Sequence, residues 1–265
     1  MLNEFKPDPA AAALLREIYI NGFTSSQDPL IEEMLSAGLV KEIPGRRFVF
    51  TSAGLSLALS MREPSPEWQE RAERILCVEG SRIRPLISPK GLTVGVEKQI
   101  EEIINSEPVL IPRSFAEETP YYKQIISYVS IIRGDEVFAT RRLSKGGEAR
   151  LHGLISLGIG GHMNPELDGA EGDILSRGLR REIEEEVDIK GSFGSLIPRG
   201  IINDDTNEVG SVHAGFFYTL ETDGKVFVRE TEKLEGLWLR RSELSSYAGG
   251  METWSQIIVP VLEKL

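Results

Sequence analysis

Cysteine, histidine and long apolar runs are all scarce in this chain of 265 residues. The single cysteine, Cys77, excludes an intramolecular disulfide framework and any zinc site built from several cysteines. No apolar run approaches the roughly 18 residues of a membrane-spanning helix, so we expect no transmembrane segment. The first residues lack the basic stretch that precedes the apolar part of a secretory signal. Together these absences favour a cytoplasmic protein.

Positive charge is also in short supply, because 41 acidic residues face 30 basic ones and the net charge is −11. Residues 1–75 hold eight basic and eleven acidic side chains, and the remainder of the chain is more acidic still. Neither part is a basic platform, so we expect no nucleic-acid partner and no membrane partner. A surplus of carboxylates is compatible with divalent cations but does not by itself indicate them.

The first 75 residues are predicted to form a small helical domain. Asp28 before Pro29 is typical of a helix start, and Pro44-Gly45 is typical of a turn between two strands. The predicted elements are helices over residues 10–20, 30–37 and 51–59 and two short strands between residues 41 and 50. This order resembles a winged-helix module. Ser65-Pro66 is expected to open a further helix, over residues 67–76, that leads into the second domain.

The second domain, residues 76–265, alternates between strand and helix patterns. Few of its strands are continuous apolar runs, which favours a mixed sheet with helices on its faces over a doubly wound parallel sheet. The fold class is therefore α+β. The predicted strands are 125–132, 136–141, 154–158, 195–202, 212–220 and 237–239, and the predicted helices are 96–104, 173–187 and 252–263.

Three glutamates of the helix predicted over residues 173–187 share one face. Glu182, Glu185 and Glu186 stand at positions i, i+3 and i+4, and each like-charged pair at that spacing costs about 0.2–0.5 kcal/mol. They also lie near the helix C-terminus, where the macrodipole disfavours anions. A divalent cation held by oxygen ligands would offset that cost, and Mg²⁺ or Mn²⁺ suits carboxylates better than zinc does.

A plainer interpretation is that the arginines of this helix, Arg177, Arg180 and Arg181, pair with its glutamates on a solvated face. The segment before the helix favours a ligand site instead. Gly158, Gly160 and Gly161 end a predicted strand and leave backbone N–H groups able to approach a phosphate oxygen.

The run from Arg181 to Ile189, R-E-I-E-E-E-V-D-I, resembles the R-E-U-x-E-E-x-G-U core of the Nudix box, in which U is aliphatic. Asp188 replaces the usual glycine. Gly160 and Glu166 match the opening G-x5-E of the box, but about seven extra residues separate Glu166 from Arg181. Asp173, which stands inside this insertion, could take the place of the second glutamate.

Further segments resemble a little-described branch of bacterial Nudix phosphohydrolases, over roughly residues 76–265. They are 123–126, 145–152, 160–165 and 203–207. The resemblance implies a Nudix αβα sandwich and hydrolysis of a nucleoside diphosphate linked to another moiety. It also implies that Mg²⁺ or Mn²⁺ is bound by Glu182, Glu185, Glu186 and the carbonyl of Gly160 or Gly161, while Arg181 orients these carboxylates.

The substrate-binding residues expected around this centre are Gly160, Gly161, His162, Arg141 and Arg142. Lys145 and Arg150 extend the basic cluster, and Asn203, Asp204 and Asp205 end a strand near the expected site. We expect His213 to be a satisfied core residue and Trp238 to lie in the core or stack on a base. The general base is left open among Glu230, Glu232, Glu235 and Glu182.

Two alternatives to hydrolysis were weighed. A nucleotide-sensing transcription regulator would hold DNA through Arg46 and Arg47 on the wing, but the acidic charge of that domain weakens the case. An isopentenyl diphosphate isomerase would need a cysteine in the site, and Cys77 lies far from the box. For residues 1–75 we favour dimerisation or a cover over the active site, with a homodimer left open.

Overall fold

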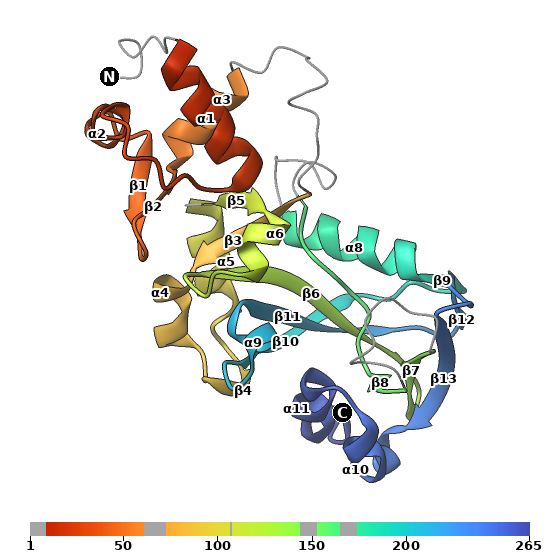
Figure 1. Cartoon of the computed structure of the whole chain (residues 1–265). Coiled ribbons are helices and arrows are strands. Elements are labelled where there is room, and N and C mark those ends of the chain that lie inside the picture. Colours follow the sequence, from red (N-terminus) through yellow and green to blue (C-terminus); the bar gives the residue numbers. More distant parts are fainter. Residues whose placement is uncertain (1–8, 61–72, 107, 144–152, 165–173) are drawn as a thin grey trace.

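A mixed sheet of nine strands forms the centre of the molecule (Figure 1). The computed structural model describes residues 9–60, 73–106, 108–143, 153–164 and 174–265. The main path of the sheet runs β13-β7-β6-β11-β10-β4, while β3 pairs with β5 and β6, and β8 pairs with β7. Strands β6 and β11 are parallel, and their neighbours pair antiparallel. The strands of this sheet are β3 (Arg74–Glu79), β4 (Lys90–Thr93), β5 (Val109–Pro112), β6 (Tyr122–Arg133), β7 (Glu136–Arg142), β8 (Ile155–Ser156), β10 (Leu196–Asp204), β11 (His213–Glu221) and β13 (Leu234–Arg240).

Helices cover both faces of the sheet. On one face, α5 (Glu97–Ser106) and α8 (Ile174–Glu186) pack on a core that includes Val129 of β6. On the other face, α11 (Thr253–Leu262) packs on a core that includes Tyr128, the neighbouring residue of β6. Alternate residues of a strand point to opposite faces, so this long buried strand serves both layers. The predicted α+β sandwich with a mixed sheet is confirmed.

Smaller elements complete the chain. A second, two-stranded sheet joins β9 (Val187–Lys190) to β12 (Lys225–Val228). The short helices are α4 (Gly80–Ile83), α6 (Arg113–Glu117), α9 (Glu208–Ser211) and α10 (Leu244–Tyr247). Among the described residues, no helix has the length and hydropathy needed to cross a membrane.

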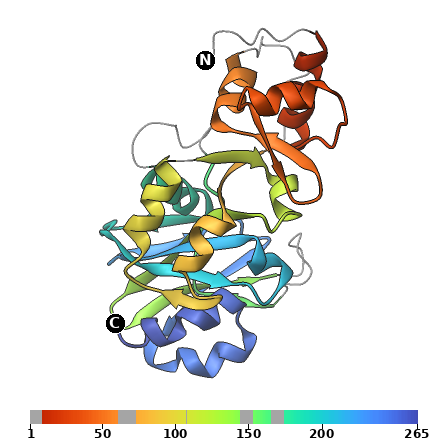
Figure 2. The same ribbon diagram turned by 90° about the vertical axis from the view of Figure 1, so that its left-hand side faces the viewer.

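Residues 9–60, which we call the N-terminal unit, lie at the end of the sheet formed by β3 and β5 (Figure 2). The elements follow the predicted order and have their own apolar core, which includes Leu15 and Met34. They are α1 (Pro9–Asn21), α2 (Leu30–Ser36), β1 (Val40–Ile43), β2 (Arg47–Phe50) and α3 (Ser52–Ser60). Gly45 and Arg46 have positive φ angles of 87° and 54° in the β1–β2 turn, which explains the turn signal at Pro44-Gly45.

The β1–β2 hairpin packs against the large sheet rather than standing away from it. Val49 of the hairpin shares a core with Ile75 of β3 and Phe115 of α6. The Arg47 guanidinium lies 5.8 Å from the centroid of the Phe115 ring, and Lys41 pairs with Glu79. The basic side chains of Lys41 and Arg47 therefore take part in the contact with the large sheet, which leaves less basic surface for DNA. The division into domains 1–75 and 76–265 stays a prediction.

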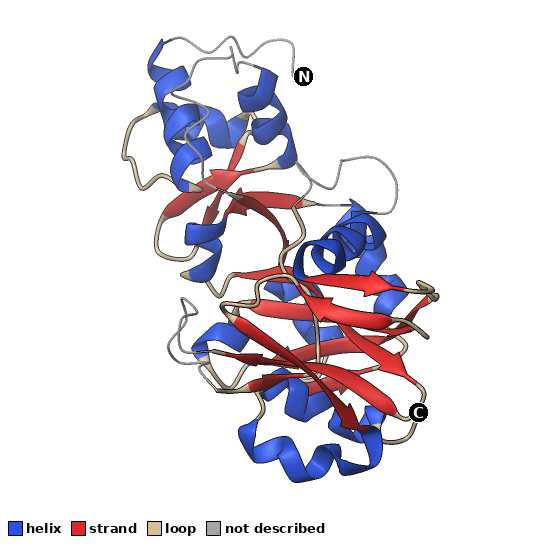
Figure 3. Ribbon diagram, turned by 90° about the vertical axis from the view of Figure 1, so that its right-hand side faces the viewer, coloured by secondary structure: helices blue, strands red, loops and turns tan. Residues whose placement is uncertain are grey.

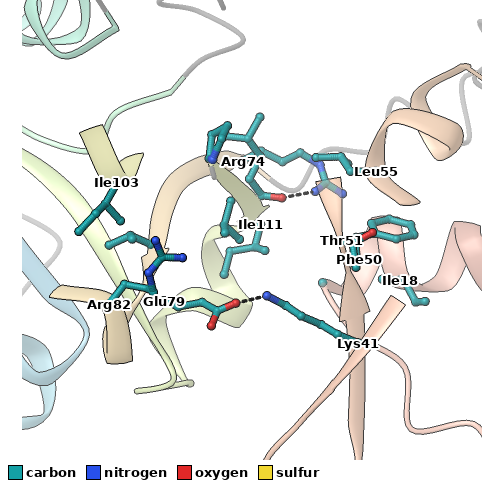
Figure 4. Close-up of a pocket in the computed structure, with 15 residues that line it drawn as sticks. Ile18, Lys41, Phe50, Thr51, Leu55, Arg74, Glu79, Arg82, Ile103 and Ile111 are labelled. Carbon is teal, nitrogen blue, oxygen red and sulfur yellow. Dashed lines mark hydrogen bonds and ion pairs between the residues drawn. The ribbon is translucent and has the colours of Figure 1, made fainter. Parts of the chain in front are cut away.

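A cavity of about 200 Å³ lies between the N-terminal unit and the sheet (Figure 4). Lys41 of β1 reaches across it to Glu79 of β3, and Arg74 donates to the carbonyl of Leu110. Ile18 and Ile111 contribute apolar walls. None of its lining residues belongs to α8 or to the glycine segment described below, so this cavity is separate from the predicted catalytic residues.

One predicted element is wrong. A helix was expected over residues 67–76, but Arg74–Glu79 is strand β3, with Ile75 and Leu76 fully buried. Because β3 lies between β5 and β6, pairing with two strands outweighs the local helix signal of Ser65-Pro66. Residues 67–72 lie outside the described residues.

Candidate active site

Helix α8 places the predicted glutamates at the edge of the core. Leu175, Leu179 and Ile183 recur at helical spacing and are buried against the sheet, which fixes the orientation of the helix. The glutamates lie away from this apolar stripe. The side chain of Glu182 is 12% exposed, whereas that of Glu185 is 56% exposed. Figure 1 shows α8 lying along the sheet, and Figure 3 shows helices on both sides of the sheet strands.

Arg181 joins the glutamates to the segment before the helix. Its Nη1 atom donates to Glu182 Oε1 at 2.7 Å and to Glu185 Oε2 at 3.1 Å. Its Nη2 atom donates to the backbone oxygen of His162 at 3.0 Å. One guanidinium therefore contacts two of the carboxylates and one loop carbonyl. Arg180, in contrast, lies 5.2 Å from the centroid of the Phe193 ring.

Glu186 has a strongly perturbed carboxyl group. Burial, and then the negative charge of Glu182, raise the pKa of Glu186 from 4.5 to about 7. The charges of Glu230 and Glu252 raise it further, while Arg142 lowers it. Among the described residues, these three carboxylates and one guanidinium are the charges that act on the pKa of Glu186. Perturbed carboxyl groups of this kind are frequent at functional sites.

The two arginines predicted to bind substrate lie in different surroundings. Arg142 acts electrostatically on Glu186, while Arg141 Nη1 lies 3.4 Å from Glu235 Oε2 in an exposed pair. Consecutive residues of a strand point to opposite faces, which explains the difference. Glu230 pairs with Lys233 at 2.8 Å, and its loop is tied to α8 because the Arg229 amide donates to the Glu186 carbonyl.

Residues 157–161, which we call the glycine segment, run antiparallel to β6. Ile159 exchanges two backbone hydrogen bonds with Val129, and the Gly161 carbonyl accepts from the Ser127 amide at 3.0 Å. A Cβ atom on Gly161 would lie 2.4 Å from Glu182 Oε2, so only glycine allows this close approach. The predicted glycine turn and the predicted glutamates are thus in contact.

His162 follows the glycine segment and carries no charge near neutral pH. Its Nε2 atom lies 2.7 Å from Gln124 Oε1, and its ring centroid lies 5.5 Å from that of His213. Burial, followed by the charge of Arg113, lowers the pKa of His162 to about 3. His162 is therefore a neutral hydrogen-bonding group in this structure. The imidazole of His213 is satisfied by the Val209 carbonyl at 2.6 Å, as predicted, but His213 is only partly buried.

The run Asn203-Asp204-Asp205 at the end of β10 binds a lysine that sequence reasoning did not assign to it. Lys123 is fully buried and donates to Asn203 Oδ1 at 2.8 Å, to the Asp205 carboxylate and to the Gly210 carbonyl. Burial lowers the pKa of Lys123, and Asp205 opposes that shift. Asp204 pairs with Lys90 at 3.5 Å. These contacts give the run a structural role at the strand ends.

Glu252 is a second residue that the sequence did not single out for the site, although it begins the helix predicted over residues 252–263. Trp238 packs against the core, with its ring 5.3 Å from that of Phe138. Five residues of the segments named from the sequence lie outside the described residues; they are Lys145, Arg150, His152, Glu166 and Asp173.

The donor atoms around α8 are oxygen atoms of the type that a hard divalent cation binds. Carboxylate oxygens lie beside backbone carbonyls, and burial together with the charge of Glu182 raises the pKa of Glu186, which a bound cation would lower. In the part of the chain that the structure describes, no three acidic, histidine or cysteine side chains already converge as a metal cluster. Glu185, turned toward Arg181, would have to rotate to complete one.

No protein-family model matches the chain. Protein YmaB of Bacillus subtilis is 44% identical over 158 residues, which cover 57% of this chain and 76% of YmaB. The crystal structure of Tm1382, described as a Nudix hydrolase, matches with a TM-score of 0.62 and 34% identity. That match covers 72% of this chain and 99% of Tm1382. The chain therefore belongs to the Nudix hydrolases, which act on pyrophosphate bonds.

Proposed function

We propose that this chain hydrolyses the pyrophosphate of a nucleoside diphosphate linked to another moiety, and that it requires Mg²⁺ or Mn²⁺. The observation that carries the proposal is the contact between the glycine segment and Glu182, one turn from Glu186 with its raised pKa. Backbone groups able to approach phosphate and carboxylates able to hold cations are the two parts that this chemistry needs.

The metal ligands we propose are Glu182, Glu185, Glu186 and the carbonyl of Gly160. Gly160 is favoured over Gly161 because the Gly161 carbonyl already accepts from the Ser127 amide. A divalent cation bound there would neutralise phosphate oxygens and lower the pKa of the attacking water. Arg181 keeps Glu182 in place through the 2.7 Å hydrogen bond.

The reaction itself is attack of water on phosphorus. A P–O bond forms to the water oxygen, the bridging P–O bond breaks, and the released phosphate takes the electron pair. The water proton passes to a carboxylate, for which we propose Glu182 or Glu230. Both act on Glu186 electrostatically, whereas Glu235 pairs with Arg141. Arg142, whose charge acts on Glu186, is proposed to bind a phosphate oxygen.

A panel of substrates tests the proposal. ADP-ribose, dinucleoside polyphosphates, nucleotide sugars and nucleoside triphosphates would each be incubated in ¹⁸O-labelled water, with Mg²⁺, with Mn²⁺ or with a chelator. We expect metal-dependent release of a nucleoside monophosphate or phosphate that carries one ¹⁸O atom. Tight binding of a nucleotide without turnover across the panel would contradict the proposal and favour a sensor.

A further inference from the structure

Glu252 places its carboxylate among three hydroxyl groups. Oε1 lies 2.6 Å from the Tyr128 hydroxyl, 2.7 Å from Ser156 Oγ and 3.2 Å from Ser255 Oγ. The Glu252 amide also donates to the carbonyl of Ile155. Three segments that are distant in sequence therefore meet at this carboxylate: β6, β8 and the start of α11.

Capping of the helix does not explain this arrangement. Glu252 occupies the position before α11, but in the described structure its side chain accepts no hydrogen bond from the first amides of that helix. The carboxylate turns toward the sheet instead.

A carboxylate only accepts hydrogen bonds, and this fixes the direction of the network. The Tyr128 hydroxyl donates to Glu252. The Ser156 hydroxyl has two acceptors in reach, Glu252 at 2.7 Å and the Gly158 carbonyl at 2.9 Å, and the charged acceptor forms the shorter and stronger hydrogen bond. Burial, followed by the charge of Glu252, holds the pKa of Tyr128 well above its ordinary value, so this hydroxyl keeps its proton. The oxygen atoms of Ser156 and Ser255 are then free to accept.

Those oxygens accept from the amides at the start of the glycine segment. The Leu157 amide donates to Ser255 Oγ at 2.8 Å, and the Gly158 amide donates to Ser156 Oγ at 3.3 Å. At the other end of the segment, Gly161 lies against Glu182. A shift of residues 157 and 158 along β6 would therefore move Gly161 relative to that carboxylate.

We infer that Glu252 is a positioning residue of the pyrophosphate site, which acts by orienting the Ser156 and Ser255 hydroxyls that hold the glycine segment. This inference rests on the proposed function for the reaction that it serves. The hydrogen-bonding role of Glu252 can be measured without substrate or metal, so this inference and the proposed function can fail separately.

The first measurement is amide hydrogen exchange in the full-length, metal-free protein. Glu252→Ala removes the acceptor and is expected to raise exchange of the Leu157 and Gly158 amides about tenfold or more, while the remaining core amides stay protected. Glu252→Gln keeps an acceptor oxygen and is expected to retain protection. Glu263→Ala is the matched control, because Glu263 lies just beyond the other end of α11 and accepts only from Ser245 in the described residues.

The second measurement is kinetic, on whichever substrate the wild-type protein turns over. Glu252→Ala is expected to lower kcat about 10- to 100-fold with KM within about threefold, because misplaced groups lose rate more than binding. Glu252→Gln is expected to recover most of kcat, and Glu263→Ala to match the wild type.

Wild-type exchange at residues 157 and 158 in Glu252→Ala, or wild-type kcat in that variant, would overturn the inference. Equal loss of kcat in Glu252→Gln would also overturn it, because charge rather than hydrogen bonding would then be the cause. If Glu252→Ala loses protection everywhere, Ser156→Ala replaces it, with faster exchange expected at Gly158 alone. A wild-type protein without any turnover contradicts the proposed function, while the exchange result still decides the role of Glu252.

Discussion

Replacing Glu186 by glutamine should stabilise the metal-free protein at alkaline pH. The pKa of Glu186 rises from 4.5 to about 7 on folding. A raised carboxyl pKa means that the folded protein holds the proton more tightly than the unfolded chain does. The stabilisation that this supplies is complete below pH 4.5 and is lost as the pH rises through about 7. Above pH 7, therefore, the ionised wild-type side chain carries a penalty that neutral glutamine avoids.

The shift sets the size of the effect. At about 1.4 kcal/mol for each pKa unit, the full shift corresponds to about 3 kcal/mol, and partial exposure of Glu186 reduces this to about 1–3 kcal/mol. For a chain of this size, each kcal/mol moves Tm by about 2–4 °C. Thermal unfolding in a chelator should show Glu186→Gln more stable than the wild type by several degrees at pH 8, and nearly equal at pH 4.5.

Glu263→Gln is the control for this measurement. The Ser245 hydroxyl and amide lower the pKa of the exposed Glu263, so its neutralisation should give no gain in Tm at pH 8. An equal gain for Glu186→Gln at both pH values, or no gain at pH 8, would refute the electrostatic account of α8.

Four further substitutions test the packing at the site, in the sheet and at the hairpin contact. Gly161→Ala places a Cβ atom against the flexible end of Glu182, so we expect kcat to fall about tenfold or more with little change in Tm. Gly160→Ala, whose Cβ would lie 2.1 Å from the Ser127 carbonyl oxygen, should instead lower Tm. Equal effects of the two substitutions would contradict this difference. Lys123→Met leaves buried acceptors without their donor and should lower the free energy of unfolding by about 3–5 kcal/mol in urea; a neutral result would show that the network is dispensable. Phe115→Ala should lower the free energy of unfolding by about 3–5 kcal/mol, because Phe115 is buried between the β1–β2 hairpin and the large sheet. An unchanged free energy of unfolding would contradict that contact.

The helix that carries the glutamates could be predicted from the sequence because its evidence is local. Apolar residues at helical spacing define its buried side, and this leaves Glu182 and Glu186 at the edge of the core. The glycine segment could be predicted for the same reason, because three of its five residues are glycine. The structure shows why one of them is needed, since Gly161 lies against Glu182. The resemblance to the Nudix box rests on these same residues.

Residues that act through distant contacts could not be predicted. Lys123 and Asp205 are far apart in the chain and meet only when β6 and β10 take their places in the sheet. Glu252 meets Tyr128 across a similar gap in sequence. Burial, which no local pattern reveals, also lowers the pKa of His162 to about 3.

The most direct test of the central claim is the turnover of one pyrophosphate substrate by wild-type protein, Glu186→Gln and Glu263→Gln, each with saturating Mg²⁺ and with a chelator. Removing one carboxylate charge from the metal site should lower kcat by about two orders of magnitude or more, while Glu263→Gln matches the wild type and the chelator abolishes turnover in all three. Full metal-dependent activity in Glu186→Gln would contradict the assignment of α8 as the metal-binding helix.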